Sequence, residues 1–218
     1  MPDYELKLWN ESNLPDSPYA HNAYNHKIWS KVSNYVRLYA LLNEGGIYLD
    51  VDVEVFKRFD DLLDGKFFLG IEYPYRVATG VMGAEVGNEI LRKAIIDLTT
   101  SYDGSEKTAS SGLSMSKVLQ NEGFDLATTK LQQKGGATIY PSDYFYPWKF
   151  DEKYYPSCIT DRTYSIHYWT GSWISPKDKM QIKLNRFLSS KTMLWARKVF
   201  RKFIKKKNNT ETLSIKNL

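Results

Sequence analysis

The chain contains one cysteine among its 218 residues. Cys158 therefore forms no disulfide within the chain, and no group of cysteines is available for a zinc cluster. This cysteine content is typical of a reducing compartment such as a bacterial cytoplasm. No apolar run reaches the roughly 18 residues of a membrane-spanning helix, and no signal peptide opens the sequence. We therefore expect a cytoplasmic protein without a transmembrane segment.

Acidic residues are scarce at the C-terminal end. Residues 183–218 contain 11 Lys or Arg and a single acid, Glu211. Residues 1–182 contain 19 basic and 24 acidic residues, so the net charge of +5 combines −5 for the body with +10 for the tail. The basic pI thus reflects the tail and does not predict a nucleic-acid-binding body. We expect one folded domain over residues 1–182 and a separate tail over residues 183–218.

Residues 193–207 of this tail have helical periodicity. The residues on one side of the helix are apolar: Trp195, Val199, Phe200, Phe203 and Ile204. Those on the opposite side are basic: Arg197, Lys198, Arg201, Lys202 and Lys205. Such a helix can pack on the domain with its basic side in water, or it can lie in the interface of an anionic membrane. We expect the second, which would make the protein peripheral on the inner face of the membrane.

Helical and strand patterns alternate along the body. Helical spacing of apolar residues covers 27–43, 88–98 and 114–120, and short apolar strands cover 67–71, 80–83, 137–140 and 164–167. The alternation in Tyr4–Trp9 predicts one more strand. Because no internal repeat or long linker interrupts this order, the sequence predicts a single Rossmann-like α/β domain with a mostly parallel sheet.

Two carboxylates follow a short strand in the first third of the body. Gly45 comes after an apolar helix and predicts its C-terminal cap, and Ile47–Leu49 reads as a buried strand. Asp50 and Asp52 then lie at the carboxyl end of that strand, on the same side if the alternation continues. A bare Asp-x-Asp is most often a solvated strand end. The preceding Gly-Gly-x-Tyr context instead favours a site for Mn²⁺ or Mg²⁺.

This stretch resembles the DXD sugar-binding motif of the retaining glycosyltransferases of family 32. That family includes capsular-polysaccharide enzymes, the yeast initiating mannosyltransferase and the glucosylating domains of large clostridial toxins. Other similar segments follow the family's order: Pro2–Glu5, Trp9–Glu11, Ser33–Arg37, Gly45–Glu54, Gly83–Glu85, Ile139–Pro147 and Ser165–Trp173. The resemblance implies a glycosyltransferase A fold whose catalytic domain is residues 1–182. It also implies retaining transfer from a UDP- or GDP-sugar to a glycan or lipid-linked acceptor, in bacterial capsular, exopolysaccharide or lipopolysaccharide synthesis.

The resemblance also assigns residues. Asp50 and Asp52 would bind the metal, with His167 as a third ligand. The donor would contact a larger set: Asn34, Arg37, Tyr48, Asp50, Ser172 and Trp173. Asp50, Asp52 and Arg37 would be catalytic, because they lie where charge develops on the leaving diphosphate. Asn34 stands where the family carries aspartate. Separately, aromatic residues crowd the second half of the chain, and Trp148 and Tyr154 are candidates for acceptor contact.

The sequence also departs from the family pattern in two places. Two other functions are therefore considered. The family's opening strand, part of its nucleotide pocket, has no counterpart before Met1, and Ala78 or Thr79 stands where relatives often carry asparagine. The main alternative is an inactive glycosyltransferase-like protein that docks on the membrane by its tail and acts as a partner in polysaccharide assembly. A nucleotidyltransferase ranks below it, because no phosphate-binding glycine loop accompanies the carboxylates.

Overall fold

The computed structural model describes residues 3–105, 110–150, 152–169 and 180. The tail helix expected over residues 193–207 and the boundary expected at residue 182 lie outside these residues. Contacts divide the chain into two units, one formed by Met1–Trp148 and Pro156–Trp173 and the other by Lys149–Tyr155 and Ile174–Leu218. The fold below is that of the first unit. No helix in the described part of the chain is both long and apolar enough to cross a membrane.

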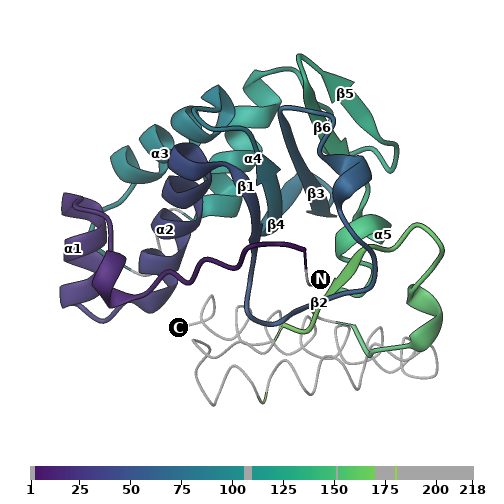
Figure 1. The fold of residues 1–218 in the computed structure, drawn as a ribbon, viewed down its shortest axis with the longest axis horizontal. Helices are drawn as coiled ribbons and strands as arrows, with labels where there is room; N and C mark the ends of the chain where they lie inside the picture. The colour runs from purple at the N-terminus through teal and green to yellow at the C-terminus, as the bar shows by residue number, and fades with distance from the viewer. Residues whose placement is uncertain (1–2, 106–109, 151, 170–179, 181–218) are drawn as a thin grey trace, which may run out of the picture. The chain divides into compact units, whose positions relative to one another are not determined.

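A five-stranded sheet forms the centre of the first unit. Its order is β1 (Gly46–Leu49), β4 (Arg76–Ala84), β3 (Phe67–Tyr73), β6 (Ala137–Tyr140) and β5 (Gln132–Lys134). Helices α2 (Trp29–Glu44), α3 (Glu89–Thr100) and α4 (Ser111–Asn121) lie together beside this sheet (Figure 1). The predicted α/β class is therefore confirmed.

The prediction of a mostly parallel sheet is corrected. Among the described strands only β3 and β6 pair in parallel, while β1–β4, β3–β4 and β5–β6 are antiparallel. Two of these pairs are hairpins, and a short turn can join only antiparallel neighbours. The β5–β6 turn uses Gly135 and Gly136, both with positive φ, as two-residue hairpin turns require.

The helices agree closely with the predicted ones. The predicted helix at 27–43 is α2, the one at 88–98 is α3, and the one at 114–120 lies within α4. The side chain of Asn88 caps α3 by accepting hydrogen bonds from the backbone N–H groups of Ile90 and Leu91, at 3.1 and 3.4 Å. The described residues also form two shorter helices, α1 (Pro18–Asn25) and α5 (Ser142–Phe145), and 3₁₀ turns at Glu11–Asn13, Asp60–Leu62 and Pro156–Cys158.

Alternation along β3 divides its apolar side chains between two clusters of the core. Phe67, Leu69 and Ile71 pack with residues of α2, α3 and α4. Phe68 belongs to the second cluster, with Phe145 and Tyr146 at and after α5. Because successive side chains of a strand point to opposite faces, the sheet is buried on both sides. The second cluster supports the carboxyl end of β1.

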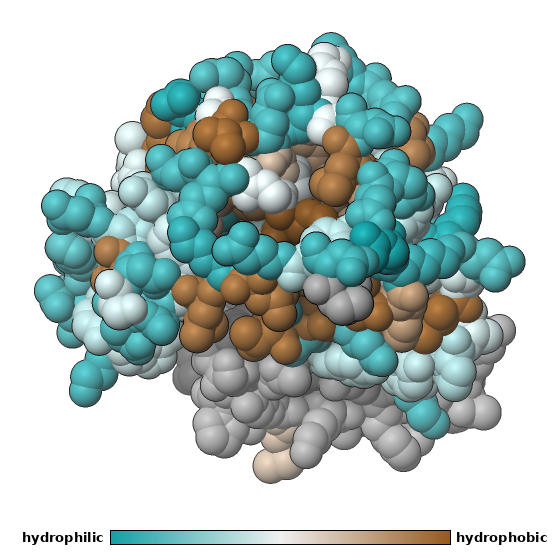
Figure 2. Space-filling model, viewed as in Figure 1, coloured by the Kyte–Doolittle hydropathy of each residue, from teal (hydrophilic) through white to brown (hydrophobic). Residues whose placement is uncertain are grey.

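The prediction of a strand over Tyr4–Trp9 is wrong. This segment pairs with no described strand, and Leu6 and Leu8 are 91% and 75% exposed. A groove of about 810 Å³ separates the segment from β1, an edge strand of the sheet. Figure 2 shows apolar residues on the face of the molecule that carries this segment. The alternating pattern fits a strand, but a strand forms only where a partner supplies its backbone hydrogen bonds.

A second, two-stranded sheet lies next to the end of β1. Strand β2 (Val53–Val55) pairs antiparallel with β7 (Ser165–His167), and Val53 is opposite His167. Gly45 ends α2 with φ of 68°, as its predicted cap position requires, and its N–H donates to Leu41 O. The chain therefore passes directly from α2 through β1 and β2, which carries Asp50 and Asp52 toward β7.

Candidate metal and donor site

Asp50 and Asp52 belong to a tight turn between β1 and β2. The backbone N–H of Asp50 donates to Gly80 O on β4 at 2.8 Å, and the N–H of Val53 donates to Asp50 O at 3.1 Å. This turn, rather than a continuing strand, determines where the two carboxylates point. The prediction that they share one side holds, but its cause is the turn.

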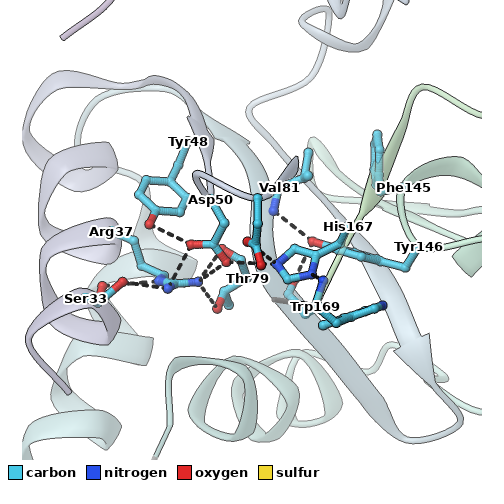
Figure 3. A network of polar contacts seen from close by, with 12 residues as sticks. Ser33, Arg37, Tyr48, Asp50, Thr79, Val81, Phe145, Tyr146, His167 and Trp169 are labelled. Carbon is cyan, nitrogen blue, oxygen red and sulfur yellow. Dashed lines mark hydrogen bonds and ion pairs between the residues drawn. The ribbon is translucent and has the colours of Figure 1, made fainter. Parts of the chain in front are cut away.

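His167 completes a cluster with these two carboxylates. Its Nε2 lies 3.1 Å from Asp52 Oδ1 and 3.5 Å from Asp50 Oδ2. One ligand atom from each of the three residues lies within 4.8 Å of the others. Pairing of β2 with β7 accounts for this geometry, and the N–H of Tyr168 adds a bond of 2.9 Å to Asp52 O. Figure 3 shows the imidazole of His167 pointing toward the Asp50 carboxylate.

This cluster fits a divalent cation by its chemistry. Two carboxylates supply hard oxygen ligands, and imidazole is a common metal ligand. Burial alone would lower the pKa of His167, but hydrogen bonds with Asp50 and Asp52 outweigh burial and raise that pKa. The two carboxylates therefore favour a positive charge at the position of the His167 ring. A cation at this position would take the place of the proton.

Arg37 contacts both oxygens of Asp50 from α2. Its Nη2 lies 3.0 Å from Oδ1 and its Nη1 lies 3.2 Å from Oδ2. Burial alone would raise the pKa of Asp50, but the charge of Arg37, with hydrogen bonds from His167 and Tyr48, lowers it. Asp50 is therefore ionised in the folded chain, as a metal ligand must be.

The remaining donors of Arg37 are held by the protein. Its Nε donates to Ser33 O at 3.1 Å, Nη2 to Ser33 Oγ at 2.7 Å, and Nη1 to Thr79 O at 3.0 Å. The side chain is buried, and the ring of Tyr48 lies 5.0 Å from its Cζ. Arg37 therefore faces Asp50 in this structure. Its predicted contact with the donor diphosphate stays a prediction.

Tyr48 and Asn34 lie at the edge of this network. The hydroxyl of Tyr48 donates to Asp50 Oδ1 at 2.9 Å. Asn34 Oδ1 accepts from Ser111 Oγ at 2.7 Å, and Ser111 Oγ lies 2.7 Å from Thr79 Oγ1. Both residues, which are predicted to bind the nucleotide-sugar donor, are thus connected to the Arg37–Asp50 pair. Their contact with that donor is untested.

Sequence reasoning missed four residues that fix this geometry: Ser33, Thr79, Gly80 and Ser111. Ser33 precedes Arg37 by four positions on a predicted helix, so helical spacing could have indicated that contact. Gly80 has no room for a side chain, because a Cβ there would lie 2.9 Å from Asp50 Oδ2 and 3.1 Å from His167 Cδ2. Nothing in the local pattern indicates the contacts of Thr79 and Ser111.

The other predicted site residues lie elsewhere. Ser172 and Trp173 are outside the described residues. Trp148 is 7% exposed and packs with Cys158 and Ile166, which leaves little of its ring for an acceptor sugar. Tyr154 belongs to the second unit and is 42% exposed. Acceptor contact by either residue is untested.

Comparison with known proteins finds two glycosyltransferase regions in this chain. Residues 1–69 match the model of a glycosyltransferase sugar-binding region containing the DXD motif, and residues 83–190 match that of the alpha 1,4-glycosyltransferase conserved region. The chain is also 30% identical over 105 residues to inositol phosphoceramide mannosyltransferase 3 of Schizosaccharomyces pombe. That match covers 44% of this chain and 29% of the relative's length. Both matched regions are glycosyltransferase regions, and with the mannosyltransferase they support a glycosyltransferase of the family 32 group, which the sequence resembles.

Proposed function

We propose that this protein transfers a glycosyl group from a nucleotide-sugar donor with the help of a divalent cation, Mn²⁺ or Mg²⁺. The observation that carries the proposal is the convergence of Asp50, Asp52 and His167 beside the buried Arg37. Two carboxylates and one guanidinium leave a net charge of −1 when His167 is neutral. A divalent cation would reverse that sign and make the site suitable for a diphosphate.

The chain's own residues then divide the work of donor binding. Asp50 and Asp52 hold the cation, which, when bound, neutralises charge on the leaving nucleoside diphosphate. Arg37 keeps Asp50 ionised and oriented through its two contacts. Tyr48 donates to the same carboxylate. We propose retention of the anomeric configuration, as the resemblance to family 32 implies.

The acceptor in this proposal is a glycan or a lipid-linked sugar. The relative's name supports the lipid-linked form, because it names an inositol phosphoceramide in connection with mannosyl transfer. The basic periodicity of residues 193–207 supports a place on an anionic membrane surface, at its cytoplasmic side. Capsular, exopolysaccharide or lipopolysaccharide synthesis in bacteria stays the proposed setting, on the resemblance alone.

Donor hydrolysis tests this function without knowledge of the acceptor. UDP- and GDP-sugars are incubated with the purified chain and Mn²⁺, and release of nucleoside diphosphate is measured. We expect release with at least one donor, its loss in Asp52→Asn, and normal release in Asp16→Asn, which changes an exposed carboxylate away from the site. Release that is unchanged in Asp52→Asn contradicts the proposal. No release and no stabilisation of the wild type by any donor favours the inactive partner instead.

A further inference from the structure

Strand β4 contains a large bulge next to the metal cluster. Leu69 of β3 pairs with Met82 of β4, and the next residue, Gly70, pairs with Ala78. Thr79, Gly80 and Val81 therefore have no partner on β3. A bulge bends its strand and frees backbone groups from the ladder, so these residues need other hydrogen-bond partners.

The backbone of this bulge holds both members of the Arg37–Asp50 pair. Thr79 O accepts from Arg37 Nη1 at 3.0 Å, and Gly80 O accepts from the N–H of Asp50 at 2.8 Å. The position of the bulge therefore determines where the Asp50 carboxylate lies relative to His167. A shift of the bulge would move the metal ligands apart.

Tyr146, a residue of the second apolar cluster, contacts both ends of the bulge. Its hydroxyl accepts from the N–H of Val81, the last residue of the bulge, at 2.7 Å (Figure 3). The same hydroxyl lies 3.4 Å from the carbonyl oxygen of Ala78, the residue before the bulge. The hydroxyl therefore connects the two ends of the bulge. Tyr146 is fully buried, and its burial raises the pKa of the phenol well above the ordinary value. The hydroxyl therefore stays neutral and can both accept and donate.

Packing around Tyr146 connects the bulge to His167. A Cβ on Gly70 would lie 2.7 Å from Phe145 Cδ2 and 3.1 Å from Tyr146 Cε2, so glycine leaves space for the rings of both Phe145 and Tyr146. The same ring lies 6.0 Å from the ring of Trp169 and 6.4 Å from that of His167, measured between centroids. Tyr146 thus contacts the bulge through its hydroxyl and the region of β7 through its ring.

We propose that Tyr146 is a positioning residue for the metal site: its hydroxyl fixes the β4 bulge that holds Asp50 in place for cation binding. The inference rests on the proposed function, because it assumes that the cluster binds a divalent cation. Tyr146 itself contacts neither the cation nor the donor. In Tyr146→Phe the N–H of Val81 loses its partner in a buried place, where an unmet donor is costly, and the bulge relaxes.

Cation affinity tests the proposal, with free Mn²⁺ measured by electron paramagnetic resonance during titration of the full chain. We expect Tyr146→Phe to raise the Kd for Mn²⁺ by about tenfold, as removal of a partner behind a metal ligand typically does. Tyr140→Phe is the matched control, because Tyr140 is a buried tyrosine of the same cluster on β6. Its Kd is expected to equal that of the wild type.

Three results would overturn the inference: an unchanged Kd in Tyr146→Phe, an equal loss of affinity in both variants, or a loss that follows thermal stability alone across them. If Tyr146→Phe does not fold, Gly70→Ala crowds the rings of Phe145 and Tyr146 together, and an unchanged Kd in that variant overturns the inference too. If the wild type binds no Mn²⁺ at all, the proposed function fails at the first step, so the two failures are distinguishable.

Discussion

Arg37 contacts both carboxylate oxygens of Asp50, at 3.0 and 3.2 Å, in a place where both side chains are largely buried. Removal of one charge from such a pair leaves the other without compensation. We predict that Arg37→Met lowers the free energy of unfolding by about 3 kcal/mol, measured by urea denaturation without metal. Arg58→Met removes an arginine whose ion pairs are exposed and is predicted to leave stability unchanged.

The double variant Arg37→Met/Asp50→Asn separates the pair from general packing. Since neither charge then remains, its loss of stability is expected to be smaller than the sum of the two single losses. Additive losses would show that the two residues do not depend on each other, and would contradict the account of the Arg37–Asp50 contact.

Gly80 is predicted to tolerate no side chain. In Gly80→Ala the new methyl group would press on Asp50 and His167, so we expect a stability loss of about 1–3 kcal/mol and much weaker Mn²⁺ binding. Gly65→Ala is the matched control, because its Cβ would lie 3.0 Å from Gly136 O, away from the cluster. That variant is expected to bind Mn²⁺ normally. Normal binding by Gly80→Ala, measured by calorimetry, would refute the crowding argument.

The metal-free protein is predicted to lose stability as the pH rises through the pKa that His167 has in the folded chain. The pKa of His167 is raised in the folded chain, so the contribution of its protonated ring is fully present below the unfolded pKa of about 6.5 and disappears as pH rises through the folded pKa. Mn²⁺ affinity is predicted to change in the opposite direction, because the cation competes with the proton.

Thermal unfolding in EDTA across this pH range checks the prediction for His167. The decrease in Tm with rising pH is expected to be smaller in His167→Gln than in the wild type. His21→Gln changes an exposed histidine and is expected to behave like the wild type. Equal pH dependence of the wild type and His167→Gln would mean that the His167 ring is not coupled to the carboxylates.

Local patterns in the sequence predicted those parts of the fold that depend on neighbouring residues. The apolar spacing and the Asn88 cap located α3, and Gly45 located the end of α2, because a cap and a positive φ are properties of a few adjacent residues. The motif context around Asp50 and Asp52 likewise located the cluster. His167 was predicted as a third ligand only through the family resemblance.

The parts that were not predicted depend on which strands pair and in which register. The alternation of Tyr4–Trp9 could not show that no described strand pairs with this segment. Hairpin pairing of β3 with β4 gives the sheet its antiparallel character and creates the bulge at Thr79–Val81. That bulge and the donors of Arg37 arise from contacts between segments far apart in the chain, which a single sequence does not encode locally.

The most direct test of the account is calorimetric titration of the purified chain with Mn²⁺. If Asp50, Asp52 and His167 form one cation site, the wild type will bind one Mn²⁺ per chain, and Asp52→Asn will bind it at least about tenfold more weakly at the same pH. Absence of binding by the wild type, or equal affinity in Asp52→Asn, would contradict the central claim.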